Sequence, residues 1–307
     1  MAVFLQAPSY VLGEIEAGYE SIPGLPARAR ELGLQPRADL WGWGRIHRTE
    51  RGLEELAIET AQATLAAAGL EPARVDLLML CSTQFPGDGT THGRFVETVM
   101  AGLGLCSASY LGLTLNRCTN LLAALRTGEA LVASGRYRRI LVVSADLEPD
   151  EASRLQGFAL FSDGAASCLL SDEGACGYQV LGSASAQDIS TLDWSNEISA
   201  DLSGQVNDRL LGPHGLVVGD VSALMHPNIF KPLVVMKERL AGFAPVQLFT
   251  ANISRVGHCF AADPLINLVD RTAVGHVPDG GIAMLAGSVP GSRIGVLLRS
   301  MPGNAPS

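Results

Sequence analysis

The sequence predicts an α/β protein in which buried strands alternate with amphipathic helices. Short, continuous apolar runs of strand length alternate with Ala- and Leu-rich segments of helical periodicity. Two of these helical segments stop at a glycine, Gly69 and Gly135, and glycine is common just after a helix. Continuous apolar strands are typical of a sheet that helices cover on both faces.

The first half of the chain contains most of the strong helical patterns. The expected helices cover residues 53–68, 93–103 and 121–133, and the expected strands cover residues 75–81, 110–115, 139–144 and 165–170. The last of these strands follows an Asp-Gly pair, which favours a tight turn. The first half is therefore predicted to consist of repeated strand–helix units.

The second half is predicted to have the same alternation of strands and helices as the first, although no sequence repeat proves a duplication. Strands are expected over residues 178–183, 221–225, 246–250, 282–288 and 293–299, and helices over residues 229–240 and 260–274. Residues 185–219 are polar, contain glycine and are weakly periodic, so we expect a loop or cap there.

The composition indicates a large buried core and argues against nucleic acid as a partner. Of the 307 residues, 47% are hydrophobic and only 17% are charged, which suggests that more surface than usual is buried, for instance against a second subunit. The net charge of −9 does not provide the concentrated basic surface that nucleic acid requires. No apolar run is long enough to span a membrane, and no secretory signal is visible at the N-terminus.

The cysteine pattern predicts reduced thiols in a cytoplasmic protein. The six cysteines are scattered and form no C-x-x-C pair, so neither a disulfide framework nor a metal site is expected.

One cysteine lies where a nucleophile is expected. Cys118 stands at a strand-to-helix turn, and the following helix should start at about Thr119. The positive end of a helix dipole lowers the pKa of a thiol, and the free N–H groups there can hold an oxyanion. The alternative is a buried structural cysteine, which is common because free cysteine packs as a small hydrophobe. That alternative is favoured for Cys81 and Cys168, which lie at or within strands.

Four stretches follow one another in an order that points to a known family. They are the Cys118 turn with its helix and S-G-R-Y-R-R-I-L-V-V-S-A-D, then L-F-S-D-G-A-A-S-C-L-L at 160–170, H-P-N at 226–228 and R-V-G-H-C-F-A-A-D at 255–263. A fifth, weaker match is W-G-W-G-R-I-H-R at 41–48. In their order and spacing along nearly the whole chain, they resemble the beta-ketoacyl-acyl carrier protein synthase III family of the thiolase-like superfamily.

The resemblance implies a thiolase fold, with two similar βαβαβ halves in a five-layer αβαβα arrangement and normally a homodimer. It divides the chain into residues 1–172, which carry the nucleophilic cysteine, and residues 173–307, which carry the catalytic histidines. It implies that Cys118 accepts an acyl group and that His226 works with the thiol and holds the incoming thioester. No permanently bound cofactor is implied, because the acyl-CoA or phosphopantetheine thioester of an acyl carrier protein is a substrate.

Two departures from the family pattern affect the expected chemistry. The family's active-site Asn falls on His258, whose neutral imidazole can donate one hydrogen bond to an oxyanion. Asn228 and Asp263 are candidate orienting residues; Asp263 can orient His258 or His226, or simply favour the start of a helix. The region between Ser171 and His226, which in the family supplies part of the acyl pocket, is also short.

These departures favour an acyltransferase that passes the acyl group from Cys118 to a hydroxyl or amine, in secondary metabolism. The first alternative is decarboxylative condensation with a malonyl thioester, because His258 can take over the work of the missing Asn. The second is a non-catalytic partner subunit. Such a subunit should lose its nucleophile first, whereas this chain retains Cys118. A degradative thiolase that uses Cys259 as its second cysteine fits the motif order less well.

A basic cluster near the N-terminus is the candidate site for coenzyme A or a phosphopantetheine arm. Arg45, Arg48 and Arg51 stand close together in an acidic protein, and guanidinium groups suit phosphate geometry. Trp41 or Trp43 could stack on the adenine. The alternative for this cluster is solvated surface charge.

Overall fold

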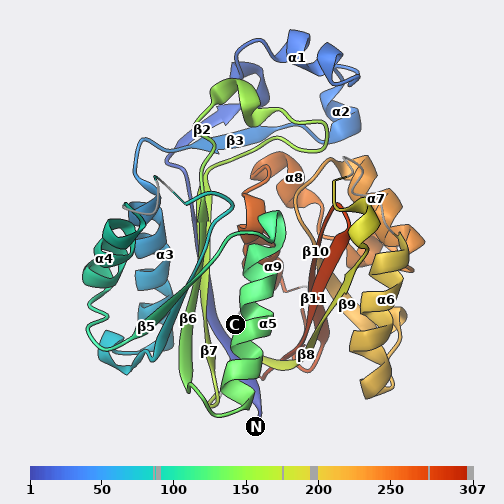
Figure 1. Ribbon diagram of the computed structural model, residues 1–307. Helices are drawn as coiled ribbons and strands as arrows, with labels where there is room; N and C mark the ends of the chain where they lie inside the picture. Colours follow the sequence, from blue (N-terminus) through green and yellow to red (C-terminus); the bar gives the residue numbers. More distant parts are fainter. Residues whose placement is uncertain (86, 88–90, 175, 194–199, 276, 303–307) are drawn as a thin grey trace.

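The computed structural model arranges the chain in five layers, as Figure 1 shows. It describes residues 1–307 except 86, 88–90, 175, 194–199, 276 and 303–307. Two sheets are separated by a central helical layer, and each sheet carries further helices on its outer face. The α/β prediction and the thiolase architecture that the resemblance implied are confirmed.

The first sheet and its outer helices come from the N-terminal part of the chain. Its strands, in spatial order, are β5 (Ser109–Leu113), β4 (Leu77–Cys81), β6 (Arg139–Asp146), β7 (Gly164–Ser171) and β1 (Val3–Leu12). The helices α3 (Leu53–Ala68) and α4 (His92–Leu103) cover its outer face. Strands β4, β5 and β6 are parallel, so their carboxyl ends lie at one edge of the sheet.

The second sheet comes from the C-terminal part and joins the first edge to edge. Its strands, in spatial order, are β8 (Tyr178–Gln187), β11 (Ser292–Ser300), β10 (Ile282–Val289) and β9 (Val221–Met225). A short antiparallel pairing of β1 with β8 links the two sheets. The helices α6 (Ala200–Leu211) and α7 (Lys231–Leu240) cover the outer face.

Two helices lie between the sheets and form the central layer (Figure 1). They are α5 (Asn120–Ala133) and α9 (Asp263–Ala273), and each follows a single 3₁₀ turn, Arg117–Thr119 before α5 and Phe260–Ala262 before α9. Leu121, Leu122 and Leu125 of α5 are fully buried. The first turn of α5 is therefore packed between the sheets, while Arg126, Thr127 and Ala130 further along the helix are exposed.

A smaller unit covers one end of the sheets, at the top of Figure 1. It contains the hairpin of β2 (Ile15–Gly18) with β3 (Arg45–Arg48), together with α1 (Leu25–Glu31) and α2 (Ala38–Trp41). The short helix α8 (Ala251–Arg255) lies below it. Further 3₁₀ turns occur at Tyr19–Ser21, Pro72–Arg74, Glu151–Arg154, Ile189–Thr191, Gly212–His214, Val218–Asp220 and Pro245–Gln247.

Two expectations about the second half were wrong. Residues 185–219 are not only a loop, because β8 continues to Gln187 and α6 covers Ala200–Leu211. The strand expected at residues 246–250 is a 3₁₀ turn followed by one parallel bridge from Leu248 to Leu224, because a proline at 245 starts the turn. The described part of the second sheet therefore has four strands and this single bridge.

The predicted boundary between residues 172 and 173 falls between β7 and β8, but the division into two domains stays a prediction. No helix in the described part of the chain is long and apolar enough to cross a membrane. Within the same residues, no group of three His, Cys, Asp or Glu side chains could hold a metal ion.

Candidate active site

Cys118 lies in the 3₁₀ turn that precedes α5, half-buried at the end of the central layer. Arg117 before it has a positive φ of 51°, which turns the chain sharply from β5 into the helix. The Asn120 side chain fixes this turn, since its Oδ1 accepts the N–H of Asn116 at 3.0 Å and its Nδ2 donates to the Ser82 carbonyl at 3.0 Å. The helix dipole of α5 therefore points its positive end at the thiol.

The other cysteines that sequence reasoning considered are core residues. Cys81, Cys168 and Cys259 are buried, and burial raises the pKa of each thiol. This confirms the structural reading of Cys81 and Cys168. The buried Cys259 thiol does not suit the second cysteine of a degradative thiolase, because the thiolate is the reactive form.

His258 is held by a buried carboxylate. Its Nδ1 lies 2.5 Å from Oδ2 of Asp263, and both side chains are almost fully buried. The same carboxylate accepts the N–H of Asn228 at 2.6 Å and of Cys259 at 2.7 Å. Burial alone would lower the pKa of His258, but the charge of Asp263, followed by that of Cys118, outweighs it and raises this pKa well above its ordinary value. The raised pKa favours the protonated form of His258, which interacts with both Asp263 and Cys118.

His226 has the opposite electrostatic environment. It is fully buried directly after β9, and burial lowers its pKa below the ordinary value. Its Nδ1 lies 2.9 Å from the Pro227 carbonyl oxygen. A carbonyl can only accept, so Nδ1 carries the proton and Nε2 carries the lone pair. Nε2 is buried and has no hydrogen-bond partner among the described residues.

The two histidines thus differ in protonation, which suits them to different tasks. A protonated imidazole can stabilise a nearby thiolate, and a neutral imidazole can accept a proton. Pairs of titratable groups whose environments separate their pKa values are typical of acid–base sites.

Asn228 and Asp263 form part of a buried polar network behind the histidines. Asn267 Nδ2 donates to the His226 carbonyl at 2.7 Å and to Asn228 Oδ1 at 3.0 Å. Asn252 in turn donates to Asn267 Oδ1 at 2.8 Å. Asp263 therefore binds the side chain of His258, while Asn228 and Asn267 fix the backbone that carries His226.

Aromatic rings shield His258 from water. The Phe161 ring lies 4.9 Å from the His258 ring and 4.5 Å from the Phe260 ring, and Phe158 lies 6.2 Å from His258. Cys118 packs against the same apolar cluster. A water-poor environment strengthens the interaction between an imidazolium and a thiolate.

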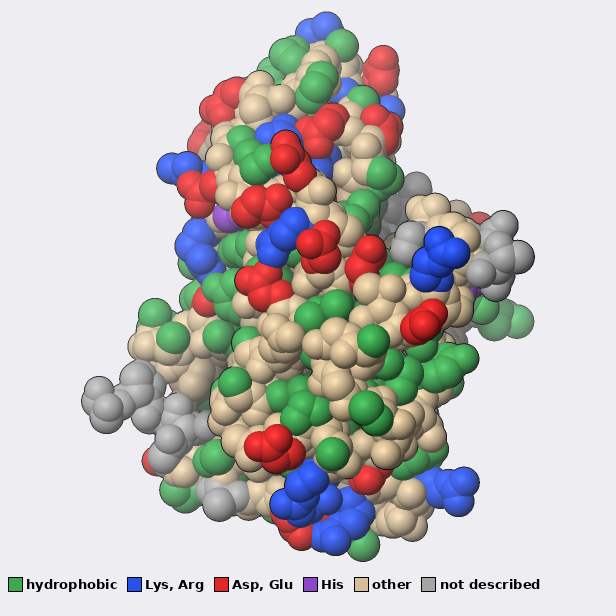
Figure 2. Space-filling view, turned by 90° about the vertical axis from the view of Figure 1, so that its left-hand side faces the viewer, with side chains coloured by type: hydrophobic (Ala, Val, Ile, Leu, Met, Phe, Trp, Pro, Cys, Tyr) green, Lys and Arg blue, Asp and Glu red, His purple; other side chains and the backbone are tan. Residues whose placement is uncertain are grey.

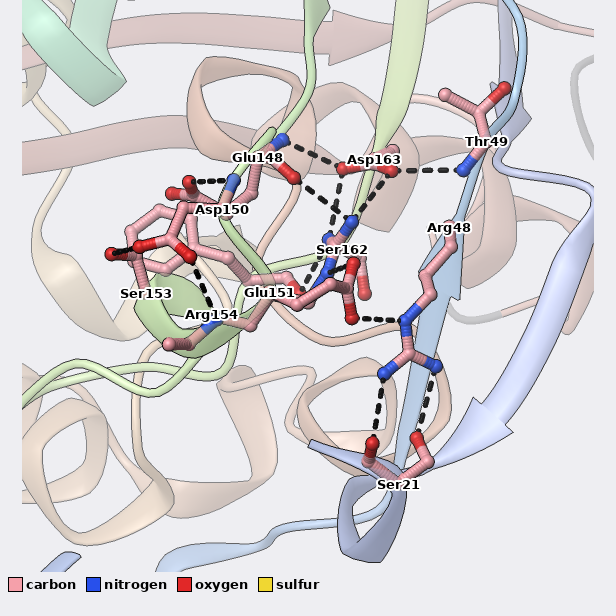
Figure 3. Close-up of polar contacts among 12 residues, drawn as sticks. Ser21, Arg48, Thr49, Glu148, Asp150, Glu151, Ser153, Arg154, Ser162 and Asp163 are labelled. Atoms are coloured by element: carbon pink, nitrogen blue, oxygen red, sulfur yellow. Dashed lines mark hydrogen bonds and ion pairs between the residues drawn. The ribbon is translucent and has the colours of Figure 1, made fainter. Parts of the chain in front are cut away.

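A buried ion network holds the backbone of His258 and was missed by sequence reasoning, which assigned only a turn to Asp163 (Figure 3). Arg154 and Asp163 form a bidentate ion pair at 2.9 and 3.0 Å. The neighbouring Ser162 donates its N–H to the His258 carbonyl at 3.0 Å, and His258 N–H donates to the Leu160 carbonyl at 2.8 Å. The F-S-D-G motif, which contains Asp163 and contributed to the family resemblance, was the sequence signal that could have indicated this network.

The candidate coenzyme residues lie in the smaller unit, and each has a partner within the chain. Arg48 joins the Arg154–Asp163 network, because Glu151 accepts from both arginines. Arg48 donates to Glu151 at 2.6 Å and to Ser21 at 3.0 Å (Figure 3), and Arg45 pairs with Glu16. The Trp41 indole donates to the Gln35 carbonyl at 2.7 Å. The ligand-binding role of Trp41, Arg45 and Arg48 stays a prediction, and a phosphate would have to compete with carboxylates for both arginines.

Acidic and basic side chains alternate on this part of the surface, as Figure 2 shows. Arg51 fits the same pattern, because it pairs with Glu14 and Glu59. Exposed ion pairs of this kind contribute little to stability, about 0–1 kcal/mol each, so a phosphate could displace a carboxylate at modest cost.

Comparison with known proteins agrees with the fold and the motif order. Residues 114–188, which include Cys118, match the family model of 3-oxoacyl-[acyl-carrier-protein] synthase III. The solved structure of that synthase from Pseudomonas aeruginosa covers 100% of both chains with a TM-score of 0.78 at 22% identity. This chain is therefore similar to ketoacyl synthase III proteins, in sequence over that stretch and in fold along its length. The acyltransferase ChlB3 has the same fold, with a TM-score of 0.83 at 18% identity and 98% of each chain covered.

Curated relatives match this chain only in part. The beta-ketoacyl-[acyl-carrier-protein] synthase III of Synechococcus elongatus is 38% identical over 120 residues, which are 38% of this chain and 34% of that protein. The chain therefore spans about a third of that relative's length. The enzyme of the same name from Listeria innocua is 22% identical over 264 residues, 79% of this chain and 81% of that protein. The replacement of the family's Asn by His258 stays a prediction.

Proposed function

We propose that the protein is an acyltransferase of the ketoacyl synthase III type. It loads an acyl group from acyl-CoA or an acyl-carrier-protein thioester onto Cys118 and passes it to a hydroxyl or amine acceptor, as in secondary metabolism. The observation that carries the choice of acceptor is the Nδ1 contact of His226 with the Pro227 carbonyl, at 2.9 Å. This contact makes Nε2 a proton acceptor, which an attacking hydroxyl or amine needs.

In the first step, the Cys118 thiolate attacks the thioester carbonyl. A new S–C bond forms, the bond to the donor thiol breaks, and backbone N–H groups at the start of α5 stabilise the oxyanion. The leaving thiolate takes the proton of the His258 imidazolium. This step leaves an acyl-Cys118 thioester, a neutral His258 and a free donor thiol.

In the second step, the acceptor O–H or N–H gives its proton to Nε2 of His226 as its oxygen or nitrogen attacks the acyl-enzyme. The bond to Cys118 breaks and the thiolate is released. The proton can then move from His226, whose pKa is lowered, to His258, whose pKa is raised, so its return is favourable. The resting ion pair of Cys118 and His258 is restored.

Decarboxylative condensation with a malonyl thioester is the second candidate, because the matched relatives carry the name of that synthase. Its enolate needs hydrogen-bond donors, and His226 presents an acceptor instead. A non-catalytic partner subunit is a weaker proposal, because the chain retains the Cys118 thiol together with His226 and His258.

A second copy of the chain is the expected partner in the assembly. Strand β5 is the edge of the nine-stranded sheet, and its Tyr110 and Leu111 are exposed. Unpaired apolar edge strands favour pairing with another chain, so we propose a homodimer through β5. A reactive thiol also suits the reducing cytoplasm.

The experiment that tests the acceptor separates the two steps with His226→Asn. Cys118 is first loaded from an acyl-CoA, and the acyl-enzyme is then offered hydroxyl, amine or malonyl thioester acceptors. Asparagine cannot accept the proton, so the variant should load normally and retain the acyl group, while the exposed-site control His214→Asn behaves like the wild type. Release of carbon dioxide coupled to product in the wild type, with no ester or amide formed, would contradict the proposal.

A further inference from the structure

A second buried carboxyl group lies beside the two site turns and has no role in the steps above. Asp146 ends β6 and is only 3% exposed. Its Oδ1 accepts hydrogen bonds from Ser82 Oγ at 3.1 Å and from the Thr83 N–H at 2.5 Å. Its Oδ2 has no hydrogen-bond partner among the described residues. A buried, incompletely bonded carboxyl group is costly, so its presence points to a function.

Asp146 is connected to the Cys118 turn through two successive contacts. It binds the Ser82–Thr83 segment, which directly follows β4. The carbonyl of Ser82 accepts Asn120 Nδ2 at 3.0 Å. Asn120 also accepts the N–H of Asn116, which begins the turn that carries the thiol. The carboxyl group therefore holds the Ser82–Thr83 segment, to which the Cys118 turn is hydrogen-bonded through Asn120.

Asp146 also pairs with a residue that lies against the turn carrying His258. It pairs across β6 and β7 with Gly164, and a Cβ placed on Gly164 would lie 3.2 Å from the Cys259 sulfur. Burial raises the pKa of Asp146 to about 7, although hydrogen bonds from Thr83 and Ser82 and, to a smaller extent, the positive charge of His258 act in the opposite direction. The carboxyl group and the imidazolium therefore interact.

The other titratable groups around Asp146 carry little free charge. The thiols of Cys81 on β4 and Cys259 before α9 are neutral, since burial raises their pKa. Asp163, on the segment before β7, is paired with Arg154. His258 is thus the cation, among these described residues, that responds to the charge of Asp146.

We propose that Asp146 is a positioning residue for the nucleophile. Its carboxylate holds the Ser82–Thr83 segment beneath the Cys118 turn, and its negative charge beside His258 favours the imidazolium–thiolate form of the pair. The inference rests on the pairing of Cys118 with His258 in the proposed function, and it is independent of the acyl donor and acceptor.

The test measures thiolate reactivity and therefore needs no acyl substrate. The rate of Cys118 alkylation by iodoacetamide is followed by peptide mass spectrometry between about pH 5 and pH 9, with Cys118→Ala to assign the peptide. Asp146→Asn keeps the shape of the side chain and removes its charge, so the alkylation rate near neutral pH should fall about tenfold, which corresponds to one pKa unit. In the wild type, the rate should rise near pH 7 as Asp146 ionises, and this rise should be absent from the variant. The exposed-site control Asp208→Asn should match the wild type.

A second variant keeps the inference testable if Asp146→Asn does not fold. Ser82→Ala removes one hydrogen bond to the carboxylate, so the step near pH 7 should move to higher pH. Alkylation profiles of Asp146→Asn or Ser82→Ala that superimpose on the wild type would overturn the inference. Failure of acyl loading with normal alkylation would instead count against the proposed function alone.

Discussion

The turns that begin the two central helices share one backbone design but present different chemistry. Arg117 before α5 and Phe260 before α9 both have a φ of 51°. In each turn, the side chain at the first helical residue reaches back to the N–H four residues earlier. Asn120 accepts from Asn116 at 3.0 Å, and Asp263 accepts from Cys259 at 2.7 Å.

The difference lies in the second polar atom of each capping side chain. The amide of Asn120 donates to the Ser82 carbonyl, so no negative charge is added beside Cys118. The carboxylate of Asp263 accepts from Asn228 and binds His258 at 2.5 Å, so it supports a cation. The same turn geometry therefore holds a thiol at the start of α5 and supports a cation at the start of α9.

The largest effect is expected when the His258 turn is made like the Cys118 turn with Asp263→Asn. Without the carboxylate, the pKa of His258 should fall and the imidazolium–thiolate pair should be lost. We expect the rate of acyl loading to drop about 10²–10⁴-fold, the scale seen when the carboxylate partner of a catalytic histidine is neutralised. Stopped-flow loading with an acyl-CoA measures this rate, and an unchanged rate would rule out the role of Asp263.

The converse change, Asn120→Asp, should weaken the Cys118 turn. A carboxylate cannot donate to the Ser82 carbonyl, and the buried charge would face another oxygen. The free energy of unfolding should fall by about 2–4 kcal/mol, and Cys118 alkylation should slow. Urea denaturation measures the first effect, with Asn120→Ser as the comparison because serine can retain a hydrogen bond.

Asp146→Asn should stabilise the fold above neutral pH. A carboxyl group whose pKa is raised by folding contributes stability that is fully present below its unfolded pKa of about 4 and lost as the pH rises through about 7. The variant should therefore be more stable than the wild type by about 2–4 kcal/mol at pH 8, with the gap closing near pH 4. Thermal melting at both pH values measures the difference in stability between the variant and the wild type. A variant that is less stable than the wild type at pH 8 would contradict the prediction.

Glycine substitution should distinguish the positive-φ residues of these two turns, and the smallest effect is expected at Arg117. Arg117→Gly relieves backbone strain at an exposed position and should change the free energy of unfolding by less than about 1 kcal/mol. Phe260→Gly also removes a buried ring that lies 4.5 Å from Phe161, so it should destabilise by about 3–5 kcal/mol. Equal effects at the two positions would show that packing does not distinguish the turns.

The sequence predicted the elements whose signal is local. The helix at 53–68 and the strand at 221–225 have the predicted bounds, because apolar periodicity and glycine ends lie within one segment. Strand β1 was missed because the pattern is broken by Pro8 and by a register shift between Gln6 and Ser9. Helix α6 was missed because its buried positions are separated by many polar residues.

Site features that depend on distant contacts could not be predicted from the sequence. The Cys118 turn is a local strand–helix junction and was recognised. The charge of His258 requires the positive φ of Phe260, which brings Asp263 back onto the ring. Asp146 meets Ser82 across 64 residues of sequence, and no local pattern indicates such a contact.

The most direct test of the account asks whether Cys118 carries an acyl group. Intact-protein mass spectrometry after incubation with a panel of acyl-CoA and acyl-carrier-protein donors measures this. The account predicts a mass increase of one acyl group in the wild type, absent in Cys118→Ala and retained in Cys259→Ala. No increase with any donor, or an equal increase in Cys118→Ala, would contradict it.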